Sequence, residues 1–192
     1  MITWQPGSTF TGEANGWTSS LPLLRRLWAG EVVSKEIGPI GPPPARPAGP
    51  ELLIGGYVPA VVRRIAAWGD GYMAPGGGEP ASMMQLWQHI AEAWRNAGRS
   101  GQPRWVGASY FALGPNAVDQ ASRYIKANYG YNPELAERRL RGIPRNPAAV
   151  EDAIKRQTDM GVDEFVLRPC AEELDQMERL AEVAARLSHS IA

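Results

Sequence analysis

The sequence has few residues that bind metals or form disulfides. It contains one cysteine, Cys170, in 192 residues, so a disulfide within the chain is excluded. Its two histidines, His89 and His189, do not combine with Cys170 into the spacing of a zinc site. We therefore expect no bound metal.

The sequence also has no excess of charge of either sign. Lysine and arginine number 20 and aspartate and glutamate number 20, so the formal net charge is zero. Domains that bind the phosphates of nucleic acids usually carry a basic excess. The balance argues against nucleic acid as the main partner.

Long apolar runs are missing as well. No stretch reaches the length that crosses a membrane. Residues 1–10 lack the basic start and apolar run of a secretory signal peptide. We expect a cytoplasmic protein with no membrane partner.

Proline and glycine are abundant, at 17 and 21 residues, but they are clustered. Residues 37–50, IGPIGPPPARPAGP, contain six prolines and are unsuited to a helix or a central strand. We expect an amino-terminal segment with one helix at 1–36, a linker at 37–50 and one domain at 51–192.

The domain at 51–192 alternates short apolar runs with longer amphipathic runs. The expected strands are Leu52–Ile54, Tyr72–Ala74, Trp105–Leu113 and Glu164–Leu167, and the expected helices are Val58–Trp68, Pro80–Asn96, Pro115–Tyr129, Pro133–Leu140, Asn146–Met160 and Ala171–Leu187. Such alternation predicts an α/β fold with parallel strands joined by right-handed crossovers. The pattern alone fits either a small open sheet or half of a barrel.

Several segments, in order, resemble the luciferase-like monooxygenases. They are Leu24–Glu31 (LRRLWAGE), Pro50–Gly56 (PELLIGG), Ala60, Arg63-Arg64, Gly69–Tyr72 (GDGY), Asn128–Gly130, Gly142–Val150 (GIPRNPAAV), Gly161–Pro169 (GVDEFVLRP) and Leu174–Ala181 (LDQMERLA). The resemblance runs from about Leu21 to Val183. It implies parallel (β/α) units that form about half of a TIM-type (β/α)8 barrel, the carboxyl-terminal half.

The sequence departs from this family at its amino terminus. A whole barrel takes about 250 residues, and the family's first strands have no counterpart here apart from a possible remnant strand at Ile2–Trp4. Four parallel strands would leave two unpaired edges and one face without helices, which favours association. We expect a homo-oligomer, with a dimer as its simplest form.

The resemblance implies FMN or coenzyme F420 as cofactor, with a small-molecule substrate. It assigns cofactor contacts to Gly55, Gly56, Tyr57 and Val58, which follow the first strand and begin the next helix. Glycine lets backbone N–H groups approach a phosphate, and a helix amino terminus favours an anion. The alternative is that Gly55-Gly56 is only a tight strand-to-helix turn.

Arg168 is the last cofactor-site candidate. It lies at the end of the fourth expected strand, where it could meet a cofactor phosphate or a substrate carboxylate. A surface salt bridge is the alternative. Cys170 has no histidine nearby in sequence and is not expected to act as a nucleophile.

The resemblance therefore favours an oxidoreductase or monooxygenase, although no catalytic residue is assigned. The alternative function is that of a non-catalytic module that has lost the catalytic half of the barrel. Such a module would bind the cofactor or interact with a partner. An unrelated small α/β domain would have no flavin affinity at all.

Overall fold

The computed structural model describes residues 20–36, 38–39, 41–46 and 49–191, which fall into two compact units, residues 1–52 and 53–192. Residues 20–28 of the first unit are helical, and Arg26 pairs with Glu31 at 2.7 Å. The expected remnant strand Ile2–Trp4 and the side chain of His189 lie outside the described residues.

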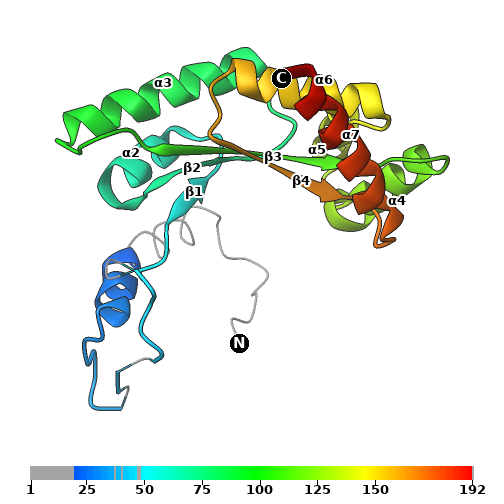
Figure 1. Cartoon of the computed structure of the whole chain (residues 1–192). Helices are drawn as coiled ribbons and strands as arrows, with labels where there is room; N and C mark the ends of the chain where they lie inside the picture. Colours follow the sequence, from blue (N-terminus) through cyan, green and yellow to red (C-terminus); the bar gives the residue numbers. More distant parts are fainter. Residues whose placement is uncertain (1–19, 37, 40, 47–48, 192) are drawn as a thin grey trace. The chain divides into compact units, whose positions relative to one another are not determined.

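The second unit is a parallel α/β structure (Figure 1). Its elements are β1 (Leu53–Gly55), α2 (Pro59–Trp68), β2 (Gly71–Ala74), α3 (Pro80–Asn96), β3 (Arg104–Phe111), α4 (Ala117–Tyr129), α5 (Pro133–Arg141), α6 (Pro147–Asp159), β4 (Glu164–Pro169) and α7 (Asp175–Ile191). The strands pair in the order β1-β2-β3-β4, and every pair is parallel. The predicted α/β class with alternating units is confirmed.

The helices of this unit begin where the sequence carries start signals. Proline occupies the first turn of α2, α3, α5 and α6, where its missing N–H has no intrahelical partner to lose. The side chain of Asn146 accepts a hydrogen bond from the backbone N–H of Ala149 at 2.9 Å, which caps α6. Local sequence therefore sets these boundaries.

Most boundaries differ from the sequence-based prediction by a few residues, and three of these differences have a clear structural cause. Helix α2 begins at Pro59, because Val58 precedes a proline and is extended, with φ −90° and ψ 150°. Strand β4 continues to Pro169, and the N–H of Cys170 still donates to the carbonyl of Phe111 at 2.8 Å. This pairing also delays α7, which begins at Asp175 rather than Ala171.

Helices cover one face of the sheet, which we call the helix face. Trp105 of β3 is fully buried there and stacks on Trp87 of α3, with ring centroids 4.6 Å apart. Phe111 packs with Val150 of α6 and Val183 of α7. Figure 1 shows α3, α6 and α7 on this side. The main apolar core of the unit lies between these helices and the sheet.

A buried glutamine fixes α7 to the end of β3. Gln176 is 1% exposed; its Oε1 accepts from the N–H of Leu113 and its Nε2 donates to the carbonyl of Leu113, both at 2.8 Å. Leu113 lies past the last pairing of β3, so these bonds satisfy backbone groups that the sheet leaves open. The carboxyl end of the sheet is thereby held in place.

Candidate functional site

The other face of the sheet, which we call the cavity face, carries the residues that alternate with those of the helix face. Strand pairing aligns Gly55 with Met73 on β1 and β2, and Tyr110 with Arg168 on β3 and β4. Aligned residues of a parallel sheet project to the same side. Tyr110 and Arg168 also lie near the carboxyl ends of their strands, where (β/α) barrels place their sites.

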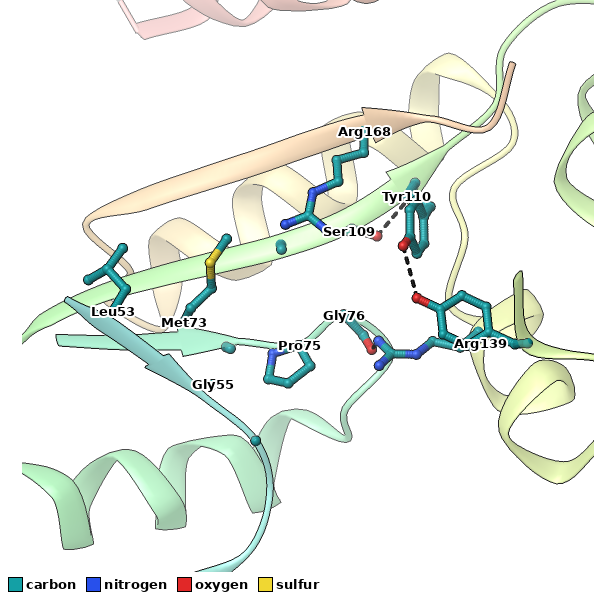
Figure 2. A pocket seen from close by; sticks show the side chains of 13 residues that line it. Leu53, Gly55, Met73, Pro75, Gly76, Ser109, Tyr110, Arg139 and Arg168 are labelled. Atoms are coloured by element: carbon teal, nitrogen blue, oxygen red, sulfur yellow. Dashed lines mark hydrogen bonds between the residues drawn. The ribbon is translucent and has the colours of Figure 1, made fainter. Parts of the chain in front are cut away.

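A cavity of about 320 Å³ opens on this face at the carboxyl ends of the strands (Figure 2). Strand residues and the loops that follow β1 and β2 form most of it. Its lining is Leu53, Gly55, Gly56, Met73, Ala74, Pro75, Gly76, Ala108, Ser109, Tyr110, Tyr129, Arg139 and Arg168. Apolar side chains thus line one part of the cavity, and aromatic hydroxyls and guanidinium groups line the other.

Two glycines bring the backbone to the cavity wall. Gly56 has φ +132°, a conformation that L residues rarely adopt, and a β-carbon there would lie 2.9 Å from Val61 Cγ2. A β-carbon on Gly55 would lie 3.1 Å from the carbonyl oxygen of Met73. The hydroxyl of Tyr72 donates to the carbonyl of Gly56 at 3.0 Å. The loop after β1 is therefore fixed, with no side chain between its backbone and the cavity.

The loop after β2 is held from two directions. The hydroxyl of Tyr57 donates to the carbonyls of Pro75 at 2.6 Å and Gly76 at 3.1 Å. The guanidinium of Arg139, on α5, also donates to the carbonyl of Gly76. A β-carbon on Gly76 would lie 2.6 Å from the carbonyl oxygen of Ala108, so glycine is needed where this loop crosses β3.

Three tyrosines form a cluster beside the cavity. The hydroxyls of Tyr110 and Tyr129 are 2.9 Å apart, and the ring of Tyr124 lies 5.0 Å from that of Tyr110. Burial acts to raise the pKa of Tyr110, but hydrogen bonds from Tyr129, Tyr124 and Arg168 outweigh it and lower the pKa. Burial and the hydrogen bond to Tyr110 raise the pKa of Tyr129 to about 12. Tyr110 is thus the hydroxyl of this pair that ionises first.

The charges along the cavity are all positive. Arg139 and Arg168 line it, and no aspartate or glutamate does so among the residues that the structure describes. Arg139 also lies over the ring of Tyr129, 5.5 Å from its centroid, in a cation–π arrangement. Such a lining attracts an anionic group.

The structure brings three of the predicted site residues together. Gly55, Gly56 and Arg168 all line the cavity. Tyr57 and Val58 do not line it: the hydroxyl of Tyr57 bonds to the loop after β2, and Val58 is 55% exposed ahead of α2. The predicted roles of these residues in cofactor binding remain predictions.

Sequence reasoning missed most of the remaining lining. In the sequence, Tyr110 lies within an expected strand, and Tyr129 and Arg139 lie within expected helices, with no role in a site predicted for any of them. Arg139 gives only a weak signal in the sequence, because it is one of three arginines near the end of an amphipathic helix. No local pattern links it to the strands.

The described residues hold no group of three or more histidine, cysteine or acidic side chains that could bind a metal ion. Cys170 is buried, and burial raises the pKa of its thiol to about 11, which disfavours the nucleophilic thiolate. Among those same residues, none of the helices has the length and apolar character needed to cross a membrane.

Comparison with known protein families identifies the chain. The profile of the luciferase-like monooxygenases matches residues 19–190. The chain belongs to this family. The predicted family resemblance is confirmed, and it extends over both described units.

Solved structures show the fold that the chain shares with known enzymes. It is similar to an F420-dependent secondary alcohol dehydrogenase in complex with an F420–acetone adduct (TM-score 0.71, 14% identity, 94% of this chain). It is also similar to EDTA monooxygenase from Chelativorans sp. BNC1 (TM-score 0.63, 15% identity, 100% of this chain). A third similar structure is monooxygenase RslO1 from Streptomyces bottropensis (TM-score 0.61, 18% identity, 94% of this chain).

The chain spans 63%, 65% and 63% of the lengths of these three proteins. It therefore has the fold of part of a TIM-type luciferase-like barrel, as predicted. A comparison with curated protein sequences gives no match.

Proposed function

We propose that the chain binds FMN or coenzyme F420 in the cavity and serves an oxidoreductase or monooxygenase reaction. The observation that carries this proposal is the composition of the cavity at the carboxyl ends of the parallel strands. Its lining combines glycine backbone, a strip of apolar side chains and positively charged arginines. The family, and the named activities of the structural neighbours, support the same class of function.

The residues present suit a flavin-type molecule. Leu53, Met73 and Ala108 offer an apolar surface for a planar ring. Gly55 and Gly56 line the cavity without a side chain, so a ligand can approach their backbone. Arg168 supplies positive charge for a phosphate. These contacts agree with the cofactor roles that the sequence predicts for Gly55, Gly56 and Arg168.

The chain's own contribution is to bind and orient. The bound cofactor would supply the hydride or oxygen chemistry. The bonds of Tyr57 and Tyr72 keep the loops after β1 and β2 in one arrangement, so the site is formed before a ligand arrives. Such preorganisation avoids the cost of ordering loops on binding.

Titration of the full chain with FMN and with coenzyme F420, followed by cofactor fluorescence, tests the proposal. We expect saturable binding of one of them at micromolar concentration, and we expect Gly55→Val to weaken it at least tenfold by filling the cavity wall. Gly38→Val is the matched control, because a β-carbon at Gly38 meets nothing within 4 Å. Absence of binding by either cofactor contradicts the proposal, and binding without turnover favours the non-catalytic module.

We also propose that the chain acts as an oligomer, with a homodimer as the simplest form. Among the described residues, β1 and β4 each pair with one strand only, so each keeps one unpaired edge. The cavity face carries Leu53, Met73 and Val166, which are only half-buried. Sedimentation at micromolar concentration tests this idea, and a compact monomer would count against it.

A further inference from the structure

The two arginines of the cavity differ in how they are held. Arg139 is anchored, because its guanidinium donates to the carbonyl of Gly76 and lies over the ring of Tyr129. Its Nε is buried and has no hydrogen-bond partner among the described residues. A buried N–H without an acceptor is unfavourable, so this group is suited to donate a hydrogen bond to an oxygen of an incoming ligand or water.

Arg168 is the exposed member of the pair. It stands opposite Tyr110 in the pairing of β3 and β4, and Figure 2 shows both side chains on the cavity face. Burial acts to raise the pKa of Tyr110, and the hydrogen bonds of Tyr129 and Tyr124 lower it. The hydrogen bond and the positive charge of Arg168 lower this pKa further. Tyr110 can also donate a hydrogen bond into the cavity while Tyr129 donates to it.

We propose that Arg139, Arg168 and Tyr110 form a binding site for an oxyanionic group, a carboxylate, sulfonate or phosphate, attached to an organic body that occupies the apolar part of the cavity. This inference rests on the proposed function, and it adds Arg139 and Tyr110 to the site. Two charge-bearing groups and a hydroxyl match the several acceptor oxygens of such an anion. The absence of carboxylates in the described lining leaves no internal competitor for the arginines.

Two sources of this anion share the same chemistry. One is the phosphate of the cofactor, and the other is the acid group of a substrate. If the substrate supplies it, the chain acts on organic anions. If the cofactor supplies it, the arginines select phosphorylated flavins over riboflavin.

The test begins with inorganic phosphate titrated into the full chain and followed by tyrosine and tryptophan fluorescence. We expect saturable binding that weakens by about tenfold or more in Arg168→Met, because a charge-assisted bond is lost. Arg168→Lys keeps the charge but not the fork-shaped donor set, so its loss should be smaller. Arg141→Met is the matched control, since Arg141 lies on the same helix as Arg139 and its side chain is 72% exposed.

A second arm identifies the source by comparing FMN with riboflavin. If the site holds the cofactor phosphate, Arg168→Met loses affinity for FMN but not for riboflavin. If it holds a substrate acid group, Arg168→Met binds both flavins as the wild type does, and phosphate still binds to the FMN-loaded wild type.

Two outcomes overturn the inference: no phosphate binding by the wild type, or an equal loss in Arg168→Met and Arg141→Met. Thermal unfolding of each variant shows whether it is folded. Flavin binding without phosphate binding overturns this inference alone. Phosphate binding without flavin or F420 binding overturns the proposed function instead.

Discussion

The hydroxyl of Tyr57 lies 2.6 Å from the carbonyl oxygen of Pro75, and this bond joins the loop after β1 to the loop after β2. A second bond, to the carbonyl of Gly76 at 3.1 Å, reinforces it. Both loops border the cavity, so a single side chain that does not line the cavity sets the distance between two of its walls.

Replacing Tyr57 with phenylalanine should therefore reduce cofactor affinity more than it reduces the stability of the fold. One hydroxyl bond contributes about 1 kcal/mol, and the side chain is 43% exposed, so we expect a small drop in the free energy of unfolding. Cofactor affinity should fall several-fold because the loops are no longer fixed. Urea unfolding and fluorescence titration measure the two effects. Tyr131→Phe, at a residue that is 80% exposed, should change neither.

Removing the hydroxyl of Tyr129 should raise the pKa of Tyr110. The hydrogen bond from Tyr129 stabilises the ionised form of Tyr110 and so lowers its pKa, and Tyr129→Phe removes that donor. The wild type should show one tyrosine ionising below the usual range and another, Tyr129, at about 12. Tyrosinate absorbance measured against pH checks this. An unchanged low-pH step in Tyr129→Phe would contradict the assignment.

Gln176→Leu should destabilise the second unit by about 3 kcal/mol. The substitution keeps a similar volume but leaves the buried N–H and carbonyl of Leu113 without partners, and each unsatisfied group costs roughly 1–3 kcal/mol. Guanidinium unfolding measures the loss. Gln88→Leu, at an exposed position of α3, should reduce the free energy of unfolding far less. Equal losses in the two variants would show that the bonds of Gln176 to Leu113 do not stabilise the unit.

Cys170 should be unreactive in the folded chain. Burial raises the pKa of its thiol to about 11, so almost no thiolate exists at neutral pH, and a reagent cannot easily reach the sulfur. A thiol reagent should therefore modify the protein slowly in buffer and rapidly in denaturant. Fast modification under native conditions would show that Cys170 is accessible.

Much of the fold could be predicted from the sequence because its signals are local. The prolines at the starts of α3 and α6, with the cap at Asn146, mark boundaries through contacts within a few residues. The family resemblance assigns Gly55 and Gly56 to the site, and Arg168 is a candidate because it lies near the end of a strand; parallel strands end at one edge of a sheet, and all three residues line the cavity.

The rest of the site depends on contacts that no local pattern encodes. Tyr110 and Tyr129 are 19 residues apart, and Arg139 reaches Gly76 across 63 residues. Their meeting depends on the path that α4 and α5 take between β3 and β4. The role of Tyr57 depends likewise on a carbonyl 18 residues away.

The connection between β3 and β4 contains three helices where the other connections contain one. Its first two, α4 and α5, supply Tyr129 and Arg139 to the cavity, whereas the sheet supplies the apolar strip. Substitutions at Tyr129 and Arg139 can therefore alter which ligands the cavity accepts without changing any residue of the strands. Ligand preference in this chain therefore depends on α4 and α5 as well as on the sheet, and it can change through residues outside the buried cluster that α4 forms with Ala112 and Cys170.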